Sequence, residues 1–241
     1  MLRSAFAGSL LALASASLVA QSPCKPSEEL QAKFRAAQAK PTAALYNELG
    51  IWYASHQQYD CATDALGQSL QLEPSQPDLA HVAFMFGASL FLGGQTNDAV
   101  TALQEVEKMG YRNITLHLML AQGLDTQHQL AEAEKEWRAA IDIDWENSPA
   151  LDGLSADLLA DNDFAAVIQL LEDPKIVSQR TAAQSLNLGR AYALSGKLDQ
   201  AARVLMDGLN TTPDSQPLAR ELNEVGKQLR QTIESAPTPA K

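Results

Sequence analysis

Hydrophobic residues recur along most of this chain with the spacing of an α-helical stripe, and the stripe itself repeats at a longer interval. Each repeat is marked by a large hydrophobic residue followed by a small one, at Leu49-Gly50, Phe86-Gly87, Leu120-Ala121, Leu154-Ser155 and Leu188-Gly189. Successive small residues are 37, 34, 34 and 34 positions apart. Another large residue follows three positions after each small one, at Tyr53, Leu90, Leu124, Leu158 and Tyr192. Because these positions are one turn apart, they predict a buried stripe on one helix of each repeat.

The second half of each repeat carries its own pair of marked positions. Twelve residues after the small residue lie Ala62, Ala99, Ala133, Val167 and Ala201. Sixteen residues after it lie Leu66, Leu103, Trp137, Leu171 and Leu205. A small residue allows two helices to approach closely, and the large residue sixteen positions on is expected to fill the space beside it. A period of 34 therefore predicts a series of helix hairpins packed side by side.

Two repeats depart from this pattern. The first is followed by three extra residues, Ser75-Gln76-Pro77, which precede a suitable helix N-cap at Asp78, so we expect them to lengthen a loop. In the fourth repeat Ser155 and Val167 replace the usual Gly and Ala. Pro174 is predicted to cut the second helix of that repeat short, because proline cannot continue a helix.

The pattern resembles the tetratricopeptide repeat (TPR) family, whose signature runs Leu-Gly-x-x-Tyr, then Ala-x-x-x-Phe, then Pro. The first repeat matches with Leu49-Gly50, Tyr53, Ala62, Leu66 and Pro74, and the fifth with Leu188-Gly189, Tyr192, Ala201, Leu205 and Pro213. The resemblance implies an all-α fold, a right-handed α-solenoid of about five TPR helix pairs. It covers 43–214, with repeats expected at 43–76, 80–113, 114–147, 148–181 and 182–214.

Capping helices are predicted at both ends of the array, because a terminal repeat would otherwise expose an apolar face. The N-terminal segment 21–42 carries Leu30, Phe34 and Ala37 at helical spacing. The segment 215–234 carries a longer stripe, at Leu218, Leu222, Val225, Leu229 and Ile233. The tail 235–241 contains two prolines and is expected to be disordered.

Residues 1–20 have the composition of a signal peptide, with Arg3 preceding an apolar stretch centred on Leu10-Leu11-Ala12-Leu13. Cleavage after Ala20 fits the small-residue preference at that site, and Ala14-Ser15-Ala16 offers another. An uncleaved membrane anchor is the alternative, although the strongly apolar part is short for a span. The chain is predicted to be exported, periplasmic or secreted; the periplasm follows from resemblance to exported bacterial TPR proteins.

Composition narrows the classes of partner. The chain has 29 acidic and 18 basic residues and a formal net charge of −11, which disfavours nucleic acid or an anionic lipid surface as a partner. Hydrophobic residues make up 46% of the chain, and they show no alternating β pattern, as expected for an all-α protein. Beyond the leader, no stretch is apolar enough to predict a membrane span.

The chain contains two cysteines, Cys24 and Cys61. In an oxidising compartment they could form a disulfide that ties the N-terminal segment to the first repeat. The alternative is one buried and one free cysteine, because two cysteines alone fix no geometry.

Motifs for catalysis are absent from the sequence. It has no Gly-x-Ser-x-Gly, no phosphate-binding glycine loop and no Cys-x-x-Cys, and its four histidines lack metal-ligand spacing. We therefore expect no enzyme activity, no cofactor and no metal. His117 is expected to pack in the core or at its edge. The acidic group Glu132, Glu134 and Glu136 is expected to be solvated, because alternate helical positions point to different sides.

The TPR resemblance also implies a binding groove, because partners of this family usually lie along the concave face formed by the first helices. The residues that spacing places on this face are Asn47, Ile51, His81, Phe84, Ala88, Phe91, Leu118, Gln122, Asp125, Asp152, Leu159 and Arg190. Family members that grip a C-terminal carboxylate use Lys, Asn and Arg there, whereas here the residues of suitable type, Asn47 and Arg190, lie in the first and fifth repeats, with three repeats between them. An apolar groove suits an amphipathic helix or an extended apolar peptide. Equally, Phe84 and Phe91 could only pack between repeats.

The predicted function is that of a non-catalytic protein–protein interaction scaffold or adaptor in the cell envelope, holding a protein or peptide partner. One alternative is a structural subunit of an envelope assembly, a homo-oligomer formed through the terminal helix. A less favoured one is an accessory domain of an enzyme.

Overall fold

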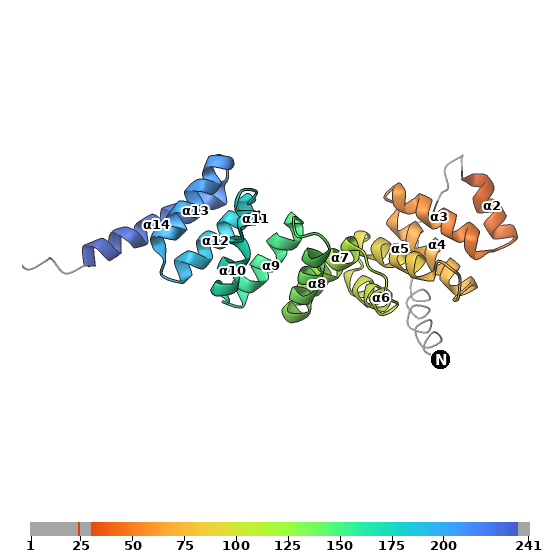
Figure 1. The fold of residues 1–241 in the computed structure, drawn as a ribbon. Helices are drawn as coiled ribbons and strands as arrows, with labels where there is room; N and C mark the ends of the chain where they lie inside the picture. Colours follow the sequence, from red (N-terminus) through yellow and green to blue (C-terminus); the bar gives the residue numbers. More distant parts are fainter. Residues whose placement is uncertain (1–23, 25–29, 236–241) are drawn as a thin grey trace, which may run out of the picture. The chain divides into compact units, whose positions relative to one another are not determined.

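The computed structural model describes Cys24 and residues 30–235. Within these residues all regular structure is helical, with thirteen helices and no strand, which confirms the predicted all-α fold (Figure 1). None of these helices is long and apolar enough to cross a membrane. The predicted signal peptide, the tail beyond Ser235 and the side chains of Phe34 and Ala37 lie outside what the structure describes.

The chain forms two compact units, and the boundary between them along the chain falls between Glu136 and Trp137, within one helix. The helices up to that point are α2 (Gln31–Ala39), α3 (Ala43–Ser55), α4 (Tyr59–Leu72), α5 (Leu79–Leu92), α6 (Thr96–Lys108), α7 (Ile114–Thr126) and α8 (Leu130–Ile143), in which the boundary falls. The second unit continues with α9 (Ser148–Ala160), α10 (Phe164–Leu171), α11 (Pro174–Val177), α12 (Ala182–Leu194), α13 (Leu198–Thr211) and α14 (Gln216–Ser235). In each unit the helices that pack together are close in sequence, such as α3 with α4 and α12 with α13, as in a repeat protein.

The small residues of the repeat pattern lie where the two helices of a hairpin touch. A Cβ atom built on Gly50 would lie 2.4 Å from Cγ of Leu66, and one on Gly189 would lie 2.6 Å from Cδ2 of Leu205. The same holds for Gly87, whose Cβ would lie 2.7 Å from Leu103 Cδ2. In each case the neighbour is the residue sixteen positions on, as the sequence predicts. A side chain at these positions has no room, because the interior is already close-packed.

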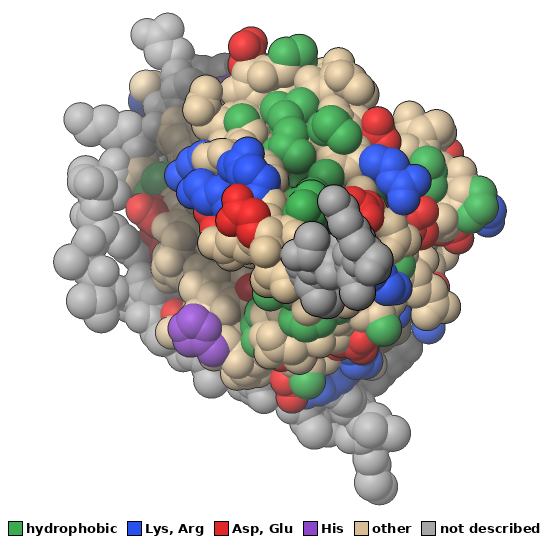
Figure 2. Space-filling model, turned by 90° about the vertical axis from the view of Figure 1, so that its left-hand side faces the viewer, with side chains coloured by type: hydrophobic (Ala, Val, Ile, Leu, Met, Phe, Trp, Pro, Cys, Tyr) green, Lys and Arg blue, Asp and Glu red, His purple; other side chains and the backbone are tan. Residues whose placement is uncertain are grey.

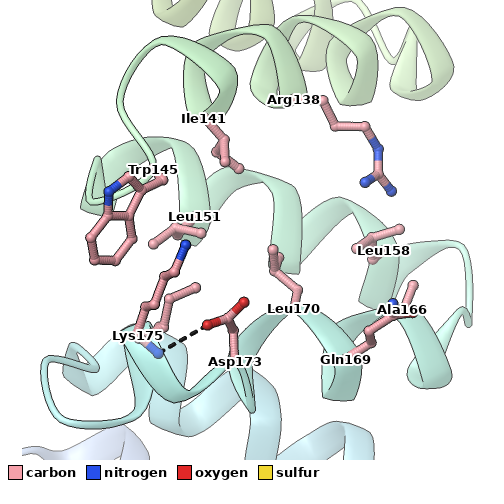
Figure 3. A pocket seen from close by; sticks show the side chains of 11 residues that line it. Arg138, Ile141, Trp145, Leu151, Leu158, Ala166, Gln169, Leu170, Asp173 and Lys175 are labelled. Carbon is pink, nitrogen blue, oxygen red and sulfur yellow. Dashed lines mark hydrogen bonds between the residues drawn. The ribbon is translucent and has the colours of Figure 1, made fainter.

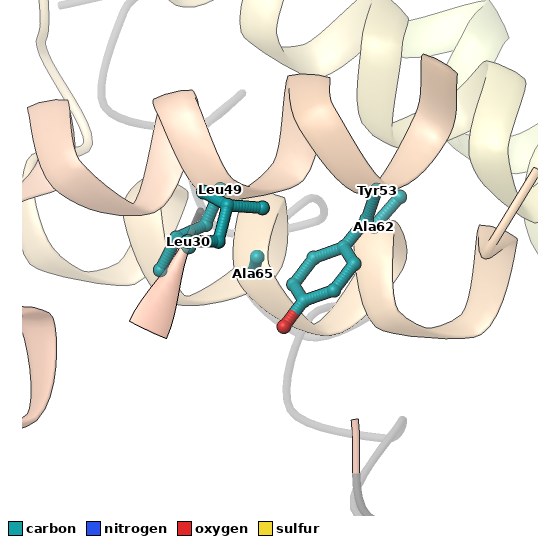
Figure 4. Packing of buried hydrophobic residues seen from close by; sticks show 5 residues of the cluster. All are labelled: Leu30, Leu49, Tyr53, Ala62 and Ala65. Carbon is teal, nitrogen blue, oxygen red and sulfur yellow. The ribbon is translucent and has the colours of Figure 1, made fainter. Parts of the chain in front are cut away.

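The N-terminal segment is attached to the first repeat in two ways. Leu30 belongs to a buried cluster with Leu49 and Tyr53 of α3 and Ala62 of α4, in which it lies beside Leu49 (Figure 4). A disulfide also joins Cys24 to Cys61 of α4, with the two Cα atoms 5.6 Å apart. Closing a loop between cysteines 37 positions apart restricts the unfolded chain, which the loop-entropy model values at about 4 kcal/mol.

The three-residue insert does more than lengthen a loop. Asp78 is the N-cap residue of α5, as predicted, but its side chain accepts no capping hydrogen bond. Instead Gln76 turns inward and is only 6% exposed. Its Oε1 accepts a hydrogen bond from Asn47 Nδ2 at 2.7 Å, and its Nε2 donates to Ser69 Oγ at 3.3 Å. The insert therefore fixes the α4–α5 connection through a buried amide.

The fourth repeat is shortened as the sequence predicts. Its second helix, α10, has 8 residues, whereas α4 and α13 have 14. The short helix α11 follows, with Pro174 in its first turn and Asp173 as its N-cap. About a turn and a half of helix is therefore missing from this side of the second unit.

The terminal helix α14 packs on α12 and α13 through its first half. Leu218 and Val225 are buried, Leu222 and Leu229 are half-buried, and Ile233 is exposed. Figure 2 looks onto the end where α14 lies and shows hydrophobic side chains at the surface among charged ones of both signs. The predicted stripe thus covers the array with its first residues and leaves its last ones in water.

Candidate functional site

Nine of the twelve expected groove residues lie in the first unit, and they differ in accessibility. Ile51 is 45% exposed, whereas Phe84 and Ala88 are buried. His81 and Gln122 are exposed, and Phe91, Leu118, Asn47 and Asp125 are half-buried. We use the name α3/α5/α7 face for the accessible set, which consists of Ile51, His81, Phe91, Leu118 and Gln122.

Phe84 contributes to packing. Its ring stacks on Tyr111, with the centroids 5.2 Å apart and the planes at 27°. The Tyr111 hydroxyl lies 3.3 Å from Nδ1 of His81. Tyr111 belongs to the connection between α6 and α7, so Phe84 and His81 together hold this connection against α5.

The other three expected groove residues lie in the second unit, where two make internal hydrogen bonds and one is half-buried. Asp152 Oδ1 accepts hydrogen bonds from Thr181 Oγ1 at 3.0 Å and Gln184 Nε2 at 2.8 Å, which fixes the start of α12. Arg190 Nε donates to Glu221 of α14 at 2.9 Å. Leu159 is half-buried.

Glu136 was expected in solvent, and this expectation is wrong. It is 4% exposed, and its Oε2 lies 2.7 Å from Nδ1 of His117, which is buried as predicted. As expected from their alternating positions, the neighbouring carboxylates lie on different sides of α8. The alternation did not determine which side faces α7, because position 136 is next to the packing residue Trp137.

The His117–Glu136 pair has two further charged neighbours. Ligand atoms of Glu107, His117 and Glu136 all lie within 4.8 Å of one another. The Lys135 ammonium lies 3.5 Å from Glu136 and 3.8 Å from Glu107, so a cation of the chain itself already lies beside both carboxylates. The cluster is best described as an ion-pair network that holds α6, α7 and α8 together.

A pocket of about 340 Å³ opens in the second unit beside the shortened fourth repeat (Figure 3). The residues that line it are Arg138, Ile141, Trp145, Leu151, Leu158, Ala166, Gln169, Leu170, Asp173, Lys175 and Ile176. A full-length second helix would continue past Leu171 along this side, so the early end of α10 leaves the space open. Pro174 is the sequence signal from which this pocket could have been suspected, but sequence reasoning missed it.

One end of the pocket is formed by an aromatic ring and a cation. Trp145 is 41% exposed, and the Lys175 ammonium lies 5.4 Å from the centre of its ring. The Asp173 carboxylate accepts a hydrogen bond of 2.9 Å from the backbone N–H of Lys175, which caps α11. Figure 3 shows Arg138 at the other end of the row of side chains, beyond Ile141 and Leu170.

Two tyrosines have raised pKa values. Burial raises the pKa of Tyr53, whose hydroxyl has no hydrogen-bond partner in the part of the chain that the structure describes. Burial also raises the pKa of Tyr192, with a further contribution from the negative charge of Glu172. Neither tyrosine lines the pocket, so both belong to the packing of the repeats.

The fold is shared with solved TPR structures. YrrB, described as a TPR protein with an unusual peptide-binding site, superposes with a TM-score of 0.68 at 17% identity, over 79% of this chain and 97% of its own. A TPR protein from Parabacteroides merdae gives 0.66 at 15% identity over 81% of both chains. MamA gives 0.62 at 17% identity, over 70% of this chain and 90% of its own. The sequence matches no protein-family model and no curated protein. These similarities establish the TPR fold.

Proposed function

We propose that this chain, which has the TPR fold, is a non-catalytic scaffold that holds an apolar segment of a protein partner on the α3/α5/α7 face. The observation that carries the proposal is Ile51, a large aliphatic side chain that is 45% exposed on the first helix of a repeat. Half-buried Phe91 and Leu118 extend the apolar surface, and His81 and Gln122 supply a polar edge. An apolar strip with a polar rim is the usual layout of a surface that takes an amphipathic helix or an extended peptide.

The contacts of the polar residues on the first helices favour an apolar partner segment over the C-terminal carboxylate of a partner chain. Asn47 is engaged with Gln76, and Arg190 is engaged with Glu221. Gripping an acidic chain end would require breaking these contacts. YrrB is described as having a peptide-binding site, which shows that this fold can serve such a role.

Export from the cytoplasm is part of the proposal. It rests on the leader-like composition of 1–20 and on the Cys24–Cys61 disulfide, because structural disulfides persist in oxidising compartments. Alkylation of the protein in intact cells, with and without reduction, tests this. Thiols that react without prior reduction would argue against an oxidising compartment.

The decisive experiment compares two charge substitutions in the first unit. Ile51→Glu with Leu118→Glu places carboxylates on the α3/α5/α7 face, whereas Leu72→Glu changes an equally exposed leucine, 46% accessible, at the end of α4. Partners captured by the mature protein from an envelope extract are identified by mass spectrometry and then titrated as purified proteins. We expect the double variant to bind at least tenfold more weakly and Leu72→Glu to bind normally. A folded double variant that keeps every partner at full affinity overturns the proposal.

Self-association through α14 is a second candidate function. It is favoured by Ile233, which is 73% exposed on the unpacked half of that helix. Light scattering of the mature protein across a concentration series tests it, with Ile233→Glu as the variant. A mass of one chain at all concentrations contradicts self-association.

A further inference from the structure

We propose that the pocket beside the shortened fourth repeat binds a small amphipathic carboxylate. The apolar body would lie over Leu151, Leu158 and Leu170, and the carboxylate would sit at the Lys175 ammonium. The site lies wholly in the second unit, and it is independent of the α3/α5/α7 face.

The floor of the pocket is suited to an apolar body. Leu151 and Leu158 are buried residues of α9, and Leu170 of α10 and Ile141 of α8 are half-buried beside them. Leu170 and Ile141 keep part of their apolar surface in contact with water, and a ligand that covers them removes that surface from water. Ligand sites are typically lined in this way, with a few polar groups among apolar ones.

Size limits the ligand. A dry apolar cavity of about 150 Å³ admits one benzene molecule. The pocket has a volume of about 340 Å³, so it admits a body about twice that size. A phenyl ring with a short alkyl chain and a carboxylate meets this limit.

Charge selects an anion among ligands of this size. The Lys175 side chain lines the pocket beside a single carboxylate, that of Asp173. The Asp173 carboxylate already caps α11. The ammonium of Lys175 lies over the Trp145 ring and, within the described residues, has no salt bridge. A ligand carboxylate would give this ammonium a charged partner while the Trp145 ring contacts the apolar body.

The test uses three probes with one apolar body and different head groups: 4-phenylbutyrate, 4-phenylbutan-1-ol and 4-phenylbutylamine. Each is titrated into the mature protein and followed by NMR at the Trp145 indole N–H, which is assigned with Trp145→Phe. We expect the carboxylate to bind at least tenfold more tightly than the alcohol and the amine to bind most weakly. Equal affinity of the carboxylate and the alcohol overturns the proposal.

Three variants locate the site. Lys175→Met should weaken 4-phenylbutyrate about tenfold while changing the alcohol less than twofold. Lys227→Met, which removes a half-exposed lysine of α14 that pairs with Glu224, should change neither. Ala166→Leu, which adds bulk to the pocket lining, should weaken both probes. Unchanged 4-phenylbutyrate affinity in Lys175→Met, with the fold intact by circular dichroism, contradicts the assignment.

Discussion

The structure predicts that glycine-to-alanine substitution changes the stability of the second unit in opposite directions at two positions. Gly189 of α12 faces Leu205, and a Cβ there would lie 2.6 Å from two atoms of that side chain. Gly226 lies within α14, and a Cβ there would meet no atom of the described residues within 4 Å. Both glycines are interior to helices, so both substitutions carry the same gain in helix propensity, about 1 kcal/mol. The difference between them therefore isolates the steric cost.

The magnitude follows from the packing around Leu205. This residue is fully buried, so it has little room to move away from a new methyl group. Overpacking of this kind costs about 1–3 kcal/mol. After the propensity gain, Gly189→Ala should lower the free energy of unfolding by about 0–2 kcal/mol. Gly226→Ala should raise it by about 0.5–1 kcal/mol, because nothing opposes the gain.

The measurement is urea unfolding by circular dichroism, together with hydrogen exchange of α12 and α13 amides, because repeat proteins open locally. A double-mutant cycle adds a control. Leu205→Ala by itself should cost about 2–5 kcal/mol. In that background Gly189→Ala should become stabilising, because the clashing atoms are gone. If Gly189→Ala stabilises the wild-type protein as much as Gly226→Ala does, the close-approach argument is refuted.

Two further substitutions test the polar and aromatic groups of the first unit. His117→Leu should lower the free energy of unfolding by about 1–3 kcal/mol, because the buried Glu136 carboxylate loses its closest partner and keeps only the more distant Lys135 ammonium. The His117→Leu/Glu136→Leu double variant should recover most of this loss in urea unfolding; equal loss in both variants would contradict the pairing. Tyr53→Phe should change stability at neutral pH by less than about 1 kcal/mol, because the hydroxyl has no hydrogen-bond partner among the described residues. Because the folded-state pKa of Tyr53 is raised, the stability that its neutral hydroxyl contributes is complete below about pH 10 and is lost above it. Between about pH 9 and 11 the free energy of unfolding of Tyr53→Phe should therefore fall less steeply than that of the wild-type protein; identical slopes would contradict this.

The repeat hairpins were predictable because their packing is local. Gly50 and Leu66 are sixteen residues apart, and the contact between them follows from helix geometry and a short turn. The truncation at Pro174 was predictable for the same reason, since proline acts on its own helix. The consequence of that truncation, an open pocket, was missed because it depends on three other helices.

The binding face could be predicted only as a list of positions. Spacing placed Ile51 and Phe84 on the same face, but the structure leaves one exposed and buries the other under Tyr111. That difference depends on the α6–α7 connection, which the 34-residue period does not describe. Asn47 and Asp152 likewise looked available, and their hydrogen bonds to Gln76 and Gln184 depend on inter-repeat contacts.

The sequence by itself determined the helices, their pairing and the residues at which the two helices of a hairpin touch. These features depend on interactions between residues that are less than one repeat apart, and the periodic pattern records them directly. Only the tertiary structure decided that Glu136 is buried against His117, that Gln76 is an internal amide and that Trp145 and Lys175 border a pocket. Each of these depends on which side chain a neighbouring helix presents. The hydrophobic pattern along the sequence does not encode which polar side chains meet in this way.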